Sequence, residues 1–355
     1  MKKFLIINPF GLGDVLFTTP ALSAIKKSYP DAFIGYWCNE RVEELLRNNP
    51  DINKIFALSR GDLKRIYNES RIKGICKFLK LLRDIKKERF DISLDFSSEH
   101  RYSLISKLLG IKKRVGFNYK NRGRFLTERI DINGYISKHV VEYYLDLLKP
   151  LDIAPKKRCL VLGISDTARM RIKNKISRFG IKDTDLLIGI AAGAGASWGK
   201  DASIKHWPAI KFAQLADSLC KDFGAKILIL GDDSERPIAD IIANTMVSKP
   251  VDLVGKTSLE EFCAVISNLK VLVTNDGGPL HIAVALGVKT VSIFGPVDDL
   301  VYGPYPLNDM HVVIKKDITC RPCYQDFKLA LCDRERECIN NISVDEVYSA
   351  VRSLL

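Results

Sequence analysis

Short apolar, β-branched runs alternate with helical patterns along the first half of the chain. Strand-like runs at 4–8, 32–38, 92–96 and 114–117 are separated by helical stretches, of which 79–90 is amphipathic with a basic outer face. A strand-length run followed by a 3.6-residue period is the rhythm of βαβ units. The pattern therefore predicts a mostly parallel sheet with helices on both faces.

The same rhythm starts again in the second half. It weakens between 155 and 185, resumes at 186–196, and continues with runs at 225–233, 250–255, 271–278 and 290–296. Two successive series predict an α/β protein with two Rossmann-like domains that face each other across a cleft. We expect the domains to span 1–170 and 171–342, and the last helical segment, 343–355, is a candidate to pack back on the first domain.

Length and composition agree with two soluble domains. The chain has 355 residues, 46% of them apolar and 27% charged, and single cores stop growing beyond about 250–300 residues. No apolar run approaches the ~20 residues of a membrane span. The opening MKKFLIINPFGLGD is too short in its apolar part for a signal peptide and is expected to form the first strand of a cytoplasmic protein.

Positive charge is concentrated in the first half. Residues 1–150 hold 29 Lys and Arg against 17 Asp and Glu, whereas the remainder holds 26 against 25. A basic half beside a neutral half suggests an anionic partner such as nucleic acid, an anionic lipid surface or a phosphorylated glycan, with a generally lysine-rich composition as the alternative. The candidate contacts are Arg60, Lys64, Arg65, Arg101, Lys112, Lys113, Arg114, Lys120, Arg122 and Arg124.

The glycine-rich stretch GLGD follows the first strand and precedes a helical pattern. Gly11 and Gly13 permit a tight turn, and a helix that starts there offers unsatisfied N–H groups to an anion. Asp14 supplies a carboxylate at that place. It either caps its own helix or stands ready to accept a proton, and in both cases it disfavours a dinucleotide phosphate beside it.

A second glycine-rich turn lies in VTNDGGPLHIAVALG, residues 273–287. A strand ends there and a helix begins near Pro279, a residue that a first helical turn tolerates well. The N–H groups around Gly277 and Gly278 are expected to cradle a diphosphate, with Asp276 and His281 as polar partners. The alternative is a plain turn with a core histidine.

Two further strand ends carry candidate residues. The small-residue loop 191–208 contains Gly193 and Gly195 and leads to Lys205, which is placed to offset charge on a leaving diphosphate. Glu235 follows another strand, where an acid often binds ribose hydroxyls. A solvated surface acid is the alternative for Glu235.

These stretches together resemble the ADP-heptose:lipopolysaccharide heptosyltransferases, glycosyltransferase family nine. The resemblance rests on GLGDVLFTTPAL, KHWP, LGDDSE and VDLVGKTSLEE, and above all on NDGGPLHIAVALGVKTVSIFGPVD. It implies a GT-B fold and an inverting, metal-independent transfer of heptose from ADP-heptose to the inner core of lipopolysaccharide. The first domain would hold the acceptor and the second the nucleotide sugar.

The resemblance also implies roles for the matching residues. Asp14 would be the general base and Lys205 the cation at the donor phosphate, with Glu235 at the ribose. Contacts to the donor diphosphate would come from Asp276, Gly277, Gly278 and His281. The family often has Ser or Thr where this chain has Gly277, and the loop before KHWP is longer than usual.

Other functions and ligands remain open from the sequence. The alternatives are a transferase for another nucleotide sugar, a nucleotide-sugar epimerase and a basic nucleic-acid-binding module, although no nucleic-acid motif occurs. The expected partners are a nucleotide sugar, a lipid-anchored oligosaccharide and the anionic cytoplasmic face of the inner membrane. The resemblance implies that catalysis requires no metal, but Cys320, Cys323, Cys332 and Cys338 are candidates for a structural zinc site, with free thiols or a disulfide as alternatives.

Overall fold

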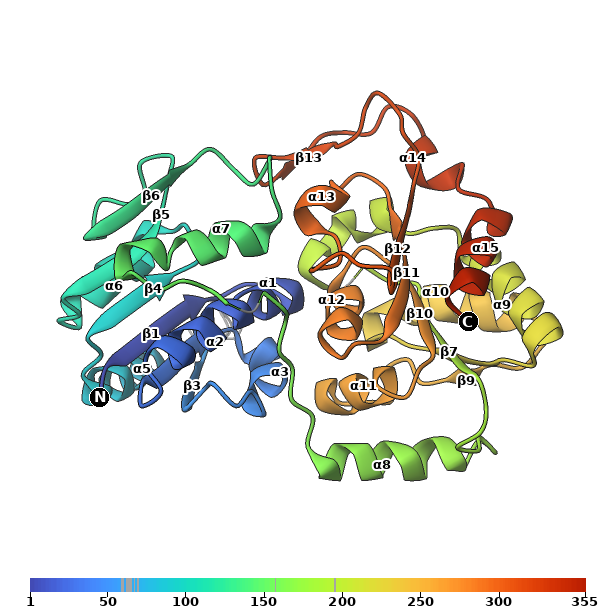
Figure 1. Ribbon diagram of the computed structural model, residues 1–355, viewed down its shortest axis with the longest axis horizontal. Helices are drawn as coiled ribbons and strands as arrows, with labels where there is room; N and C mark the ends of the chain where they lie inside the picture. Colours follow the sequence, from blue (N-terminus) through green and yellow to red (C-terminus); the bar gives the residue numbers. More distant parts are fainter. Residues whose placement is uncertain (59–60, 62–65, 67, 69, 157, 195) are drawn as a thin grey trace. The chain divides into compact units, whose positions relative to one another are not determined.

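The computed structural model divides the chain into two compact units, Met1–Gly163 and Ile164–Leu355. It describes residues 1–58, 61, 66, 68, 70–156, 158–194 and 196–355. The division falls a few residues before the expected boundary at 170, because the charged helix that follows Gly163 packs with the second unit. Each unit is built on one sheet covered by helices (Figure 1).

Both sheets have six parallel strands in the Rossmann order. In spatial order, the first sheet contains β3 (Lys54–Ala57), β2 (Phe33–Cys38), β1 (Lys3–Asn8), β4 (Ile92–Asp95), β5 (Lys113–Tyr119) and β6 (Glu128–Ile132). The second contains β9 (Val251–Asp252), β8 (Lys226–Ile229), β7 (Leu187–Ala191), β10 (Val271–Asn275), β11 (Lys289–Phe294) and β12 (His311–Lys315). The prediction of an α/β fold with two Rossmann-like parallel sheets is confirmed.

The strands that the apolar pattern did not predict lie at the edges of the two sheets. β3 and β6 are outermost in the first sheet, and β12 is outermost in the second. An edge strand keeps one side open to water, so its sequence can be polar. In β6, ERIDI, only the last residue is buried. Such a strand has no continuous apolar run to reveal it.

Helices fill the connections between the strands. In the first unit they are α1 (Leu12–Phe17), α2 (Thr19–Ser28), η1 (Glu40–Val42), α3 (Glu43–Arg47), α5 (Arg71–Glu88), α6 (His100–Leu108), α7 (Val140–Asp146) and η2 (Lys149–Leu151). In the second they are α8 (Asp166–Ser177), η3 (Ala196–Lys205), α9 (Ala209–Phe223), η4 (Asp233–Glu235), α10 (Arg236–Thr245), α11 (Leu259–Ile266), α12 (Gly278–Ala285), α13 (Asp299–Tyr302), α14 (Glu337–Asn340) and α15 (Val344–Leu354). A small hairpin, β13 (Tyr324–Gln325) with β14 (Lys328–Leu329), precedes α14.

The C-terminal helix α15 packs on the second unit, which corrects the expectation that it returns to the first. Val347, Val351 and Leu354 are buried in the core that also contains Trp207. The helix begins with a capping box between Ser343 and Glu346. Its buried positions recur every three to four residues, so the helix covers the sheet of its own unit with one apolar stripe.

None of the helices in the described ranges is long and apolar enough to cross a membrane. Three of the basic candidates, Arg60, Lys64 and Arg65, lie outside the described residues, as does Gly195. The remaining candidates can be placed.

Candidate functional site

The candidate residues gather where the strand order of each sheet reverses. In the first unit Gly11, Gly13 and Asp14 follow β1, which pairs with both β2 and β4. In the second, Gly193 follows β7 and Asp276 follows its neighbour β10. Open parallel sheets bind ligands at the carboxyl ends of strands at this switch point. The topology therefore collects residues that are far apart in sequence.

Asp14 stands at the third position of α1, where it bonds back to the start of the helix. Its carboxylate accepts a hydrogen bond from the backbone N–H of Gly11 at 3.2 Å. The side-chain amide of buried Asn8 donates to the carbonyl of Asp14 at 3.0 Å and also fixes Phe10. The capping interpretation of Asp14 is thus correct in structure, and the same bonds hold the carboxylate in one orientation.

Two tyrosines that no sequence motif indicated lie close to Asp14. Burial raises the pKa of Tyr36 and of Tyr135, and the negative charge of Asp14 adds to both increases. The Tyr36 hydroxyl is hydrogen-bonded to Thr18 at 2.8 Å, and that of Tyr135 to Ser98 and Tyr144. Both phenols therefore stay protonated near the carboxylate.

Asp95 is a second acid of this switch point, at the carboxyl end of β4. It is 3% exposed, and its carboxylate accepts bonds from the backbone N–H and hydroxyl of Ser97 at 2.9 and 2.5 Å. Burial raises the pKa of Asp95 to about 7, against the opposing effect of the Ser97 bonds. The carboxyl group is therefore near its midpoint at neutral pH.

This raised pKa predicts a falling stability with pH. An unfolded aspartate loses its proton near pH 3.9, whereas folded Asp95 keeps its proton until about pH 7. Between these values the folded state holds the extra proton, so the free energy of unfolding decreases as pH rises and levels off above pH 7. Asp95→Asn should remove this decrease and be more stable than the wild type at pH 8, by as much as about 4 kcal/mol. Denaturant titrations from pH 5 to 8.5 measure it, and parallel profiles for the two proteins would contradict it.

In the second unit Lys205 and Asp276 form a buried ion pair. The ammonium Nζ lies 2.5 Å from Oδ2 of Asp276, and the two side chains are 3% and 5% exposed. The sequence predicted Asp276 as a polar partner of a diphosphate, and in the structure its carboxylate is paired with Lys205. The pair joins the end of η3 to the end of β10.

The neighbouring residues reinforce this junction. The side chain of Asn275, which is fully buried, accepts from the backbone N–H of Trp207 at 3.0 Å and donates to the carbonyl of Ala192 at 2.5 Å. The Trp207 indole donates to the carbonyl of Ile342 at 3.0 Å. Asn275 and Trp207 stand in the NDGG and KHWP stretches, yet nothing in their spacing indicated that they bond to each other.

Glu235 lies across the carboxyl ends of β7 and β8. Its carboxylate bonds to the N–H of Asp232 at 3.2 Å. A Cβ built on Gly193 would stand 1.5 Å from Oε1 of Glu235, and one on Gly231 would stand 2.5 Å from Oε2. The two glycines are therefore needed to admit the carboxylate.

We expect Gly193→Ala to expel Glu235 from this position. A methyl group cannot share that space, so the Glu235 side chain or the strand end must move. If Glu235 binds the donor, affinity for ADP should fall about tenfold or more, a loss of roughly 1.4 kcal/mol. Calorimetry measures it, with Ser177→Ala as the control, because Ser177 is an exposed residue of the same unit at the end of α8. An unchanged affinity in Gly193→Ala would remove Glu235 from the site.

The start of α12 presents the remaining candidates. Gly277 is the residue before the helix, and Gly278 is its first residue. A Cβ on Gly277 would approach the carbonyl of Ala194 to 3.3 Å, so this turn lies against the segment that follows β7. His281 is buried, with 4% exposure. The sequence predicted the helix start at this point, and the structure confirms it.

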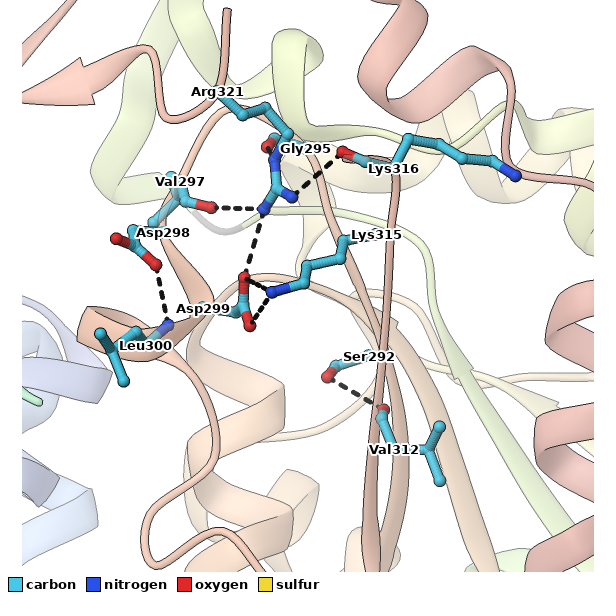
Figure 2. A network of polar contacts seen from close by, with 10 residues as sticks. All are labelled: Ser292, Gly295, Val297, Asp298, Asp299, Leu300, Val312, Lys315, Lys316 and Arg321. Carbon is cyan, nitrogen blue, oxygen red and sulfur yellow. Dashed lines mark hydrogen bonds and ion pairs between the residues drawn. The ribbon is translucent and has the colours of Figure 1, made fainter. Parts of the chain in front are cut away.

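A polar network organises the next strand end of the sheet (Figure 2). The Arg321 guanidinium donates to the carbonyls of Gly295 and Val297, at 2.5 and 3.1 Å, and contacts Asp299. Lys315 also pairs with Asp299 at 2.9 Å. The turn after β11 is thus fixed by a side chain from outside the strand, and it lies beside the end of β10.

Arg321 belongs to the four-cysteine segment. The Cys323 thiol donates to the carbonyl of Cys320 at 3.0 Å. Burial and the three other cysteines raise the pKa of Cys323 to about 11, so the four thiols are near one another. Among the described residues, however, no three His, Cys, Asp or Glu side chains are arranged to hold a metal ion. The geometry does not support the zinc candidate.

Comparison with known proteins decides the family. The sequence model of glycosyltransferase family 9 (heptosyltransferase) matches residues 78–331. The chain belongs to this family. The matched range includes the candidates from Gly193 to His281, whereas Gly11, Gly13 and Asp14 lie before it. The recognition made from the motifs is confirmed.

Relatives of this family 9 glycosyltransferase match most of its length. Lipopolysaccharide heptosyltransferase 3 of Escherichia coli is 26% identical over 304 residues, which cover 83% of each chain. The structure of a family 9 glycosyltransferase from Veillonella parvula has a TM-score of 0.83 at 23% identity, covering 99% of this chain and 97% of that one. That of ADP-heptose lps heptosyltransferase II of E. coli has a TM-score of 0.77 at 21% identity, covering 100% and 98%. Both structures share the fold.

Proposed function

We propose that this glycosyltransferase moves heptose from ADP-heptose to the inner core of lipopolysaccharide, with inversion at the anomeric carbon. The observation that supports this most is the pair of switch points, which carry a fixed carboxylate in one unit and a buried cation with a glycine-rich helix start in the other. The names of the relatives supply the sugar and the acceptor. The second unit binds the donor and the first binds the acceptor.

In the second unit, the N–H groups at the start of α12 receive the diphosphate, since Gly277 and Gly278 let backbone and ligand approach closely. Lys205 neutralises the charge that develops on the departing ADP, and its bond to Asp276 fixes the ammonium in place before the donor arrives. Glu235 binds the ribose hydroxyls beside Gly193. His281 donates to a phosphate oxygen.

In the first unit, Asp14 removes the proton of the acceptor hydroxyl as its oxygen attacks the anomeric carbon. The Gly11 N–H and Asn8 hold the helix start that carries the carboxylate. A negative charge there also stabilises an oxocarbenium-like transition state. The bond from the anomeric carbon to the diphosphate breaks as the new glycosidic bond forms.

The charge on the leaving diphosphate is met by Lys205 and the N–H groups of α12, so the reaction does not need a divalent cation. We therefore expect full turnover after dialysis against excess EDTA. The measurement is the rate of ADP release with and without added Mg²⁺. A rate that falls with EDTA and returns with Mg²⁺ would contradict this part of the proposal.

We place the enzyme at the cytoplasmic face of the inner membrane, where the lipid-anchored acceptor is made. The first unit carries 32 Lys and Arg against 18 Asp and Glu, whereas the second carries 23 against 24. The unit that binds the acceptor is thus the basic one, which suits acidic sugars, phosphates and anionic lipids.

The test is a donor screen. Calorimetry with ADP, UDP and GDP should show binding of ADP alone, and ADP-heptose with core oligosaccharide should release ADP. Release of ADP only when the oligosaccharide is present supports a transferase. Conversion of the sugar nucleotide without any acceptor would instead establish an epimerase, and selective binding of UDP or GDP would overturn the choice of donor.

A further inference from the structure

Helix α5 carries an exposed apolar stripe in addition to the face that it buries. Its inner face packs on the first core through Phe78, Leu81, Leu82 and Ile85. On another side, Ile72, Ile75 and Leu79 are 76%, 49% and 56% exposed, and Cys76 between them is exposed as well. We call Ile72, Ile75, Cys76 and Leu79 the α5 stripe. Their spacing of three, four and seven residues puts them on one face of the helix.

A row of lysines borders the α5 stripe. Lys73, Lys80 and Lys87 follow one another at intervals of seven residues, so they lie along one line of the helix surface. The whole helix has seven Lys or Arg and two Asp or Glu. Exposed apolar side chains beside a basic face are typical of helices that lie in the plane of an anionic membrane surface.

The α5 stripe is in the half of the helix that lies toward the carboxyl ends of the strands. Lys77 pairs at 2.8 Å with Glu40, which follows the carboxyl end of β2. At the other end of the helix, Glu88 pairs with Lys54 and Lys3, which begin β3 and β1. The N-terminal half of α5 is therefore on the side of the carboxyl ends, as is Asp14.

We propose that the α5 stripe inserts into the headgroup region of an anionic bilayer and docks the first unit there. The apolar side chains enter the interface, and the lysine row contacts the anionic headgroups around them. Docking through the N-terminal half of α5 brings the side of the sheet that carries Asp14 near the bilayer that holds the acceptor. The role of docking in bringing Asp14 to the acceptor rests on the proposed function, whereas the binding of the α5 stripe to lipid is independent of it.

Sedimentation with vesicles tests the docking. The wild type should bind vesicles of phosphatidylglycerol with phosphatidylcholine and should bind phosphatidylcholine alone far less. In the triple variant Ile72→Ser, Ile75→Ser, Leu79→Ser, the partition coefficient into these anionic vesicles should fall about tenfold or more at any salt concentration. In Lys73→Gln with Lys80→Gln, the partition coefficient should fall mainly at low salt, where charges are least screened. The control is Ile210→Ser with Ile241→Ser, which are 55% and 50% exposed in the second unit.

The outcomes separate docking from catalysis. The triple variant should keep its Tm and its turnover of soluble, delipidated core oligosaccharide, and should lose turnover of acceptor embedded in vesicles. Vesicle binding by the triple variant equal to that of the wild type overturns the proposal. A lower molecular mass of that variant by light scattering, with vesicle binding unaltered, would instead assign the α5 stripe to an interface between copies of the chain. A wild type that binds vesicles but does not turn over the soluble acceptor overturns the proposed function and leaves docking standing.

Discussion

Asp14→Asn should lower turnover by about a hundred- to ten-thousandfold, which is the contribution of a positioned general base. The amide cannot accept the proton of the acceptor hydroxyl. Its oxygen can still receive the N–H of Gly11, which Asp14 accepts at 3.2 Å, so the start of α1 should keep its structure. Steady-state kinetics should therefore show the loss in kcat, with the affinity for ADP measured by calorimetry nearly unchanged.

The matched control is Asp31→Asn. Asp31 is an exposed acid of the same unit, placed between α2 and β2 at the opposite edge of the sheet. Its replacement removes the same charge and should leave the rate as it is. If Asp14→Asn retains the wild-type rate, another group takes the proton. If the variant loses both the rate and the affinity for ADP, the effect of the substitution is structural.

The positions of the candidate residues could be predicted because each follows a strand. Asp276 comes directly after an apolar run, Asp14 and Glu235 follow theirs after a short turn, and the carboxyl ends of parallel strands lie on the same side of a sheet. The order of the strands within each sheet, in contrast, depends on packing that no local pattern records. β6 is an example. Its polar sequence suits an edge strand, but its place at the edge is evident only once its pairing with β5 is known.

Pairings across the sequence could not be predicted in the same way. Tyr135 lies close enough to Asp14 for the charge of Asp14 to raise the pKa of Tyr135, although strands β2 to β6 lie between the two residues in the sequence. The bond between Asn275 and Trp207 is equally remote. Helix α15 has an apolar stripe that either unit could have covered, and its amphipathic pattern alone did not identify the partner.

The second large effect should come from breaking the ion pair between Lys205 and Asp276. Removal of one member of a buried pair leaves the other charge without compensation and costs about 3–5 kcal/mol. Lys205→Met should therefore lower the Tm by roughly 10 °C. The control is Lys173→Met, because Lys173 pairs with Asp183 at 2.6 Å with both side chains exposed, and such pairs contribute about 0–1 kcal/mol.

A double-mutant cycle then separates the structural role of Lys205 from its role toward the donor. Lys205→Met with Asp276→Asn leaves no uncompensated charge, so the combined loss of stability should be smaller than the sum of the single losses. Affinity for ADP should stay low in the double variant, because neither substitution restores a cation at the diphosphate. Thermal melts and calorimetry on the same samples measure both quantities. Recovery of ADP affinity together with stability would mean that Lys205 only holds the turn at Asp276, and the donor phosphate would then need another cation.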